Sequence, residues 1–147
     1  MSADAPADAL AARWAWVDVD LAALQHNVRV LAARSAPAEP WVVVKADAYG
    51  HGAVPVARAA LDAGAVGLCV ALAAEGVGLR AAGIDAPILV LSEQPAEQAP
   101  VLVAHGLTAT VYTPAGVDAV AAAAGAGSPH PVHLKLDTGM QDRKSVG

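Results

Sequence analysis

The sequence contains no phenylalanine, and tryptophan and tyrosine together make up only 3% of it. Charged residues are also scarce, at 16% of the 147 residues, against roughly 25% in ordinary soluble domains. The hydrophobic fraction is nevertheless 56%, so it consists mostly of alanine, valine and leucine. A chain so apolar and so poor in charge is not intrinsically disordered, because disorder requires the opposite composition.

Further absences exclude classes of function. No uninterrupted apolar run reaches the roughly 18 residues of a membrane-spanning helix, and residues 1–8 lack the basic start of a secretory signal. We therefore predict a soluble, cytoplasmic protein with no membrane partner and no metal site. The net charge of −5, without a basic stripe, argues against a nucleic-acid partner. The single cysteine, Cys69, cannot form an internal disulfide, and its apolar neighbours predict a buried thiol.

What the sequence does contain is a repeated strand and helix pattern. Strands are predicted at residues 41–45, 66–70, 88–91, 108–112 and 132–137. Alanine-rich helices are predicted between them, at residues 54–63, 72–82, 96–104 and 114–124. Upstream, an alternating strand is predicted at 14–19, followed by a helix from Leu21 to about Arg34 with Asp20 as its N-cap.

This pattern predicts an α/β fold with a parallel sheet. The strands lack polar alternation, which is typical of strands that are buried on both faces. Two arrangements of such units remain open. One is an open, doubly wound sheet, which could be complete at five strands. The other is a closed (β/α)₈ barrel, of which this chain would hold only a part.

Functional residues of parallel α/β folds gather at the carboxyl ends of the strands. Lys45 follows three valines there, and a lysine against an apolar wall can act as a neutral amine nucleophile. Gly50 and Gly52 flank His51, and Tyr49 lies four residues beyond Lys45. Each residue also has an ordinary interpretation: a lysine stem packed on the strand end, an aromatic residue covering a loop, and a hydrogen-bonded loop histidine.

The segment Val-Lys-Ala-Asp-Ala-Tyr-Gly-His-Gly at 44–52 resembles the pyridoxal-phosphate attachment motif of alanine racemases. The resemblance extends to residues 16–28, 81–91 and 133–140, and spans 14–140 in all. It implies the first part of a fold-type III (β/α)₈ barrel, with about five of the eight strands. We interpret residues 1–12 as a mobile leader and 13–140 as this domain. Residues 141–147 fall outside the family pattern and resemble a translated sequencing adapter.

The resemblance implies a role for three residues. Lys45 would bind pyridoxal phosphate as a Schiff base and would act as a catalytic base, and Tyr49 would lie beside the cofactor. Lys135 corresponds to a lysine that is carbamylated in some family members and orients an arginine. The other interpretation of Lys135 is that it is an ordinary polar residue at the end of a strand. Arg143 stands one place later than the family's cofactor-contacting arginine, so that role is not transferred to it.

The implied activity is the interconversion of L-alanine and D-alanine, the latter a peptidoglycan precursor, by a homodimer. Residues 1–147 alone are expected not to racemise alanine, because the family's second base is a tyrosine from the C-terminal domain of the other subunit. Three alternatives stay open: a non-catalytic pyridoxal-phosphate-binding barrel, an aldolase that uses a lysine imine, and a racemase of another amino acid such as serine.

Overall fold

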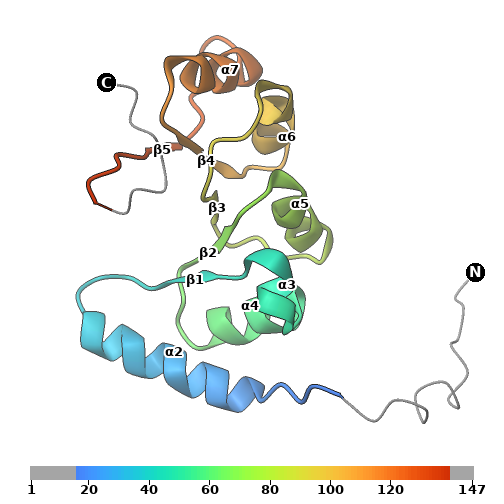
Figure 1. Ribbon diagram of the computed structural model, residues 1–147, viewed down its shortest axis with the longest axis vertical. Coiled ribbons are helices and arrows are strands. Elements are labelled where there is room, and N and C mark those ends of the chain that lie inside the picture. Colours follow the sequence, from blue (N-terminus) through green and yellow to red (C-terminus); the bar gives the residue numbers. More distant parts are fainter. Residues whose placement is uncertain (1–15, 140–147) are drawn as a thin grey trace, which may run out of the picture.

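The computed structural model describes residues 16–139 and shows one parallel sheet with helices along it (Figure 1). The five strands follow the chain in the order β1-β2-β3-β4-β5. They are β1 (Trp41–Val43), β2 (Gly67–Val70), β3 (Ile88–Val90), β4 (Thr108–Val111) and β5 (Val132–Leu134). The helices are α2 (Leu21–Ser35), α3 (Lys45–Gly50), α4 (Ala53–Asp62), α5 (Ala73–Ala81), the 3₁₀ turn η1 (Ala96–Gln98), α6 (Ala99–Ala104) and α7 (Pro114–Ala124). The predicted leader at 1–12 and the segment 141–147 lie outside the described residues.

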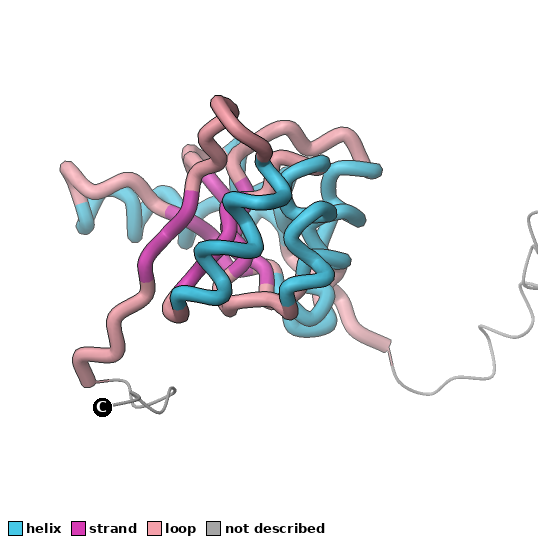
Figure 2. The backbone as a smooth tube through the Cα atoms, turned by 90° about the horizontal axis from the view of Figure 1, so that it is seen from above, coloured by secondary structure: helices cyan, strands magenta, loops and turns pink. Residues whose placement is uncertain are grey.

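The sheet is curved, and the helices that connect its strands lie on one side. Figure 2 shows the helices that connect the strands gathered on a single face of the sheet. The rings of Trp41 on β1 and His133 on β5 approach to 6.4 Å between centroids. Four strand spacings would hold these strands about 19 Å apart in a flat sheet, so the sheet must curl between them. This arrangement confirms the predicted α/β fold as five strands of a (β/α)₈ barrel and rules out the open, doubly wound sheet, whose helices would cover both faces.

The hydrophobic core lies between the sheet and the helices. Alternation along β2, β3 and β4 directs every second side chain into this layer. These residues are at most 2% exposed: Leu68, Val70, Ile88, Val90, Ala109 and Val111. On the opposite, inner face of the sheet, Cys69 is only 5% exposed, which confirms the predicted buried thiol. Burial also raises the pKa of the Cys69 thiol, so it is the neutral form that packs there.

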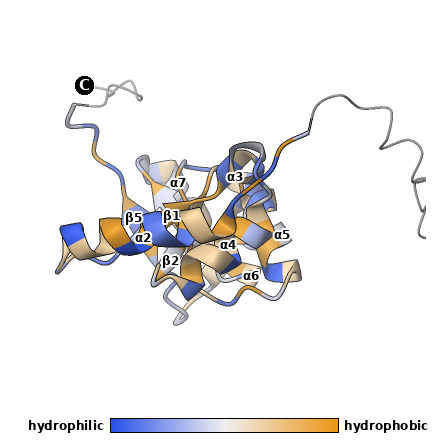
Figure 3. Ribbon diagram, turned by 90° about the horizontal axis from the view of Figure 1, so that it is seen from below, coloured by the Kyte–Doolittle hydropathy of each residue, from blue (hydrophilic) through white to orange (hydrophobic). Residues whose placement is uncertain are grey.

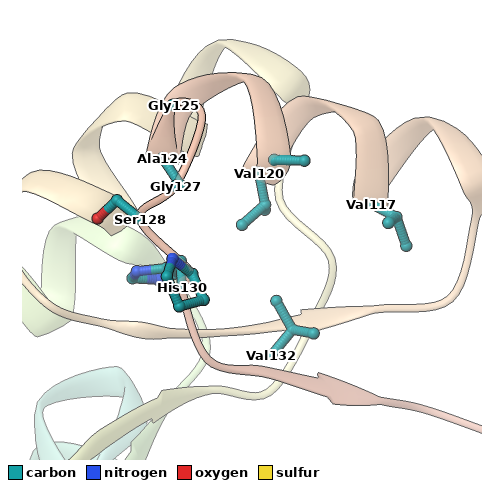
Figure 4. Close-up of a pocket in the computed structure, with 10 residues that line it drawn as sticks. Val117, Val120, Ala124, Gly125, Gly127, Ser128, His130 and Val132 are labelled. Atoms are coloured by element: carbon teal, nitrogen blue, oxygen red, sulfur yellow. The ribbon is translucent and has the colours of Figure 1, made fainter.

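Strand β5 departs from the prediction of burial on both faces. Val132 and Leu134 are 42% and 67% exposed, and Figure 3 shows hydrophobic and hydrophilic residues alternating along this part of the chain. Within the described part of the chain, no helix follows β5 to cover its outer face. A cavity of about 420 Å³ therefore opens between α7 and β5. Val120 and Val132 face each other across it (Figure 4).

The start of the described chain is partly as predicted. Asp20 is the N-cap of α2, and its Oδ1 accepts a hydrogen bond of 2.9 Å from the Ala23 N–H, as expected. The strand predicted at 14–19 is wrong over its described part, because residues 16–19 form no strand and pair with none in the sheet. A strand requires a hydrogen-bonding partner, and the described residues offer none at that position.

Candidate active site

Lys45 lies at the carboxyl edge of the sheet, directly after β1. The strand ends at Val43, two residues earlier than predicted, and Lys45 is the first residue of α3. Val44 is 1% exposed in the core under the helices, and Lys45 follows it as the first residue of α3. Lys45 is half-buried there.

The turn after Lys45 is left-handed. Residues Ala46, Asp47, Ala48 and Tyr49 have φ between 50° and 57°, although none of them is glycine. Each L-residue in this conformation costs about 1–2 kcal/mol. Four such residues in a row persist only where surrounding contacts determine them, and strained backbone of this kind clusters at functional sites.

Hydrogen bonds on the far side of the turn hold it in place. The Asp47 Oδ1 accepts from the Ala53 N–H at 2.6 Å, and the Asp47 carbonyl accepts from Gly52 N–H at 2.9 Å. His51 Nδ1 lies 2.8 Å from the Ala48 carbonyl oxygen. His51 is therefore a hydrogen-bonded loop residue, the ordinary alternative given above. Tyr49, the last of the four left-handed residues, is 61% exposed.

Glu75 holds the near side of the turn. Its Oε1 accepts from the Ala46 N–H at 2.7 Å. Its Oε2 accepts from the N–H groups of Ala71 and Leu72, at 2.7 and 3.0 Å. Burial raises the pKa of this carboxyl, but the three N–H donors and the charge of Lys45 lower it more, so its pKa lies below the ordinary range.

Lys135 follows the last strand of the sheet. Its backbone N–H donates to the Val111 carbonyl at 2.9 Å, which fixes it beside β4. Alternation from His133 places Lys135 on the inner face, where it is half-buried. Lys45 and Lys135 therefore follow the first and the last strand at the same edge of the curled sheet, with β2, β3 and β4 between these strands.

The sequence did not identify two carboxylates that organise this edge. One is Glu75, in the first turn of α5. The other is Glu93, whose Oε2 accepts from the backbone of Tyr112 and Thr113 at 2.7 and 2.9 Å, while Oε1 accepts from the Thr113 hydroxyl. Glu75 sits three residues into a predicted helix, the position from which a glutamate reaches back to the helix start. That position was the available signal.

Residues 16–139 contain neither a candidate membrane span nor a cluster of metal-ligating side chains. No helix there has the length and apolar character that crossing a membrane demands. Within the same part of the chain, no three His, Cys, Asp or Glu side chains gather closely enough to hold a metal ion.

The family model described as alanine racemase, N-terminal domain, matches residues 19–144. An alanine racemase from Nostoc is 48% identical over 131 residues, which are 86% of this chain and 34% of that protein. The chain thus spans about a third of the length of the curated relatives it matches.

Solved structures agree in fold. The alanine racemase from Bacillus anthracis with bound L-Ala-P superposes with a TM-score of 0.79 at 40% identity, over 86% of this chain and 33% of that one. The histidine racemase from Leuconostoc mesenteroides gives a TM-score of 0.76 at 30% identity, over 83% of this chain and 33% of that one.

Proposed function

The chain belongs to the alanine racemase family through its N-terminal domain, and from this premise we propose that it carries the cofactor-binding part of a pyridoxal-phosphate-dependent alanine racemase. In this proposal Lys45 is the covalent attachment point of the cofactor and one of two catalytic bases. Tyr49 lies beside the cofactor. Lys135, in carbamylated form, orients a cationic group near it. The complete enzyme is a cytoplasmic homodimer that supplies D-alanine for peptidoglycan.

One observation carries the proposal: a half-buried lysine stands at the open edge of a curled parallel sheet, on a backbone fixed on both sides. Val44, before Lys45, has its N–H bound to the Cys69 carbonyl at 2.8 Å. Ala46, after it, has its N–H bound to Glu75. A nucleophilic amine that must meet one carbonyl group repeatedly needs such a fixed base.

The residues present fit pyridoxal phosphate in their chemistry. The cofactor's aldehyde requires a primary amine, which Lys45 offers, and its ring requires a neighbouring surface, which the exposed Tyr49 phenol can supply. When bound, pyridoxal phosphate supplies an electron sink that makes the α-hydrogen of an amino acid acidic.

The chain's own residues then have separate tasks. The Lys45 amine, once released from covalent attachment, would accept the α-proton from one face of the substrate, and in the reverse reaction the protonated amine would donate a proton to that same face. The left-handed turn directs Lys45 and Tyr49 from one rigid segment. Racemisation also requires a base on the opposite face, which we propose comes from the partner subunit of the complete enzyme.

Reductive trapping tests the attachment point. The 147-residue chain is incubated with pyridoxal phosphate, reduced with borohydride and digested with trypsin. The chain has three lysines, Lys45, Lys135 and Lys144. Modification of Lys45 blocks cleavage there and leaves the cofactor on one peptide spanning 35–58, whereas modification of Lys135 gives a peptide spanning 81–143. Trapping at Lys135 or Lys144 instead of Lys45 contradicts the proposal.

Activity is tested in a hybrid that joins this chain, up to residue 139, to the remaining two-thirds of the Nostoc relative. We expect it to interconvert L- and D-alanine, and Lys45→Ala to lose activity by at least the roughly 10²–10⁴-fold that a proton-transfer base contributes. A Lys45→Ala hybrid with full activity contradicts the assignment.

A second candidate is the racemisation of another amino acid. It is favoured by the structural match to a histidine racemase, which reaches a TM-score of 0.76. The same hybrid assay with L-serine and L-histidine beside L-alanine decides between them. Turnover of either amino acid above that of alanine supports the second candidate.

A further inference from the structure

Glu75 lies on a different βα unit from Lys45, yet it contacts the residue that follows this lysine. It stands in the first turn of α5 and reaches across to the turn after β1. Its two oxygens serve two segments: Oε1 binds Ala46, and Oε2 binds Ala71 and Leu72 in its own loop. The carboxylate therefore joins two neighbouring loops at the edge where the proposed chemistry takes place.

This contact completes the fixation of Lys45. The peptide group before Lys45 is held because the Val44 carbonyl accepts from the Ala48 N–H at 3.0 Å. The peptide group after it is held because the Ala46 N–H donates to Glu75 at 2.7 Å. With both groups held, the Cα–Cβ bond of Lys45 has one direction. The hydrogen bond from the Ala46 N–H has a charged acceptor, and such bonds are stronger than those between neutral groups.

We propose that Glu75 is a positioning residue for Lys45: by holding the Ala46 N–H it starts the left-handed turn and aims the lysine amine. This inference rests on the proposed function, since it names a residue that acts through the proposed cofactor lysine. Glu75 itself does not touch the reacting atoms in this account.

Glutamine at position 75 separates the two tasks of the carboxylate. A glutamine has one acceptor oxygen, and the pair of donors at Ala71 and Leu72 engages it. Its NH₂ group then faces the Ala46 N–H, which is also a donor, so that contact becomes repulsive. Glu75→Gln is thus expected to keep the start of α5 and to release the turn after Lys45.

Glu93→Gln is a matched control. Glu93 also joins two neighbouring loops, with one oxygen on the N–H groups of Tyr112 and Thr113. Its other oxygen, however, binds the Thr113 hydroxyl, which can accept as well as donate. The NH₂ of a glutamine fits there, so this variant makes the same chemical change without an opposed pair of donors and away from Lys45.

Two measurements compare the wild type with both variants. The first is amide hydrogen exchange of the segment 45–50 without cofactor, where we expect faster exchange in Glu75→Gln and no change in Glu93→Gln. The second is the yield of reductive trapping of pyridoxal phosphate on Lys45 at limiting cofactor. We expect a fall of about tenfold in Glu75→Gln, the size that a lost charge-assisted hydrogen bond produces, and less than about twofold in Glu93→Gln.

A second variant of Glu75 distinguishes the length of its side chain from its charge. Glu75→Asp keeps the charge but shortens the side chain, so it should lose trapping as Glu75→Gln does; retention of trapping would mean that charge alone acts and would overturn the positioning role. Unchanged exchange at 45–50 in both Glu75 variants also overturns it. If the wild type traps no cofactor on Lys45, the proposed function fails, while the exchange measurement still decides whether Glu75 holds the turn.

Discussion

The indole ring of Trp41 on β1 lies over Gly67, its register partner on β2. A Cβ atom at position 67 would come within 2.5 Å of this ring, closer than real Cβ atoms approach their neighbours. The glycine thus leaves room on the inner face for the largest side chain of β1. That ring in turn reaches toward His133 on the last strand.

The first prediction follows from this close approach. Gly67→Ala is expected to lower the free energy of unfolding by about 1–3 kcal/mol, because the ring or the strand must move to admit a methyl group. Urea denaturation measures the change. Gly78→Ala is the control: it lies within α5 with no atom within 4 Å of a new Cβ, and should raise stability by about 0.5–1 kcal/mol. Changes of the same sign would contradict the argument.

The second prediction concerns the left-handed turn. Ala46 is exposed and has φ 50°, so Ala46→Gly removes a backbone cost of about 1–2 kcal/mol, while the more flexible unfolded chain takes back about 0.4–1 kcal/mol. We expect unchanged or higher stability in thermal unfolding. Ala122→Gly, at an exposed position inside the right-handed helix α7, should instead lose about 0.5–1 kcal/mol. A comparable loss at both positions would show that the turn is not left-handed in solution.

Much of the fold was predictable from local composition. The five apolar runs become five strands, each shorter than or equal to its predicted span, because valine-rich segments between alanine-rich helices have few alternatives. The helix at residues 114–124 has its predicted bounds, with Pro114 in its first turn and Gly125 after its end. The N-cap at Asp20 was likewise visible in the sequence.

The rest depends on contacts between distant residues. The left-handed turn at 46–49 contains no glycine, so residue preferences give no sign of it. It is determined by Glu75, 29 positions away from Ala46, and by the contact between Asp47 and Ala53. The prediction that β5 is buried was wrong because it, too, depends on distant contacts: a further element would have to pack against the outer face of this strand to cover it.

The third prediction concerns Arg80, at the opposite edge of the sheet from Lys45. Its guanidinium donates to four backbone carbonyls, those of Ile84 and Ala86 at 2.7 and 2.8 Å and of His105 and Gly106 at 3.0 and 3.1 Å. It therefore joins the loop before β3 to the loop before β4. Arg80→Lys should lower stability by about 2 kcal/mol in urea denaturation, because a single ammonium group cannot serve both loops.

Arg58→Lys is the control for this change. Arg58 donates a side-chain hydrogen bond to the Ala82 carbonyl at 2.8 Å, and an ammonium group can replace one such bond. A loss below about 1 kcal/mol is expected. Equal losses for the two arginines would mean that the four-carbonyl arrangement around Arg80 adds nothing to stability.

The fourth prediction concerns pH. Burial raises the pKa of Glu75 in the folded chain. The N–H groups of Ala46, Leu72 and Ala71, together with the charge of Lys45, lower it further than burial raises it, so the net shift is downward. A carboxyl with a lowered folded pKa stabilises the fold above its unfolded pKa of about 4.3, and this contribution disappears as pH falls through the folded value. Wild type should therefore exceed Glu75→Gln in thermal midpoint at pH 7, and the gap should close on acidification below about pH 4. Glu75→Gln is uncharged at every pH, so a gap that stays constant down to the acid transition would show that the Glu75 charge contributes nothing to the contact with Ala46.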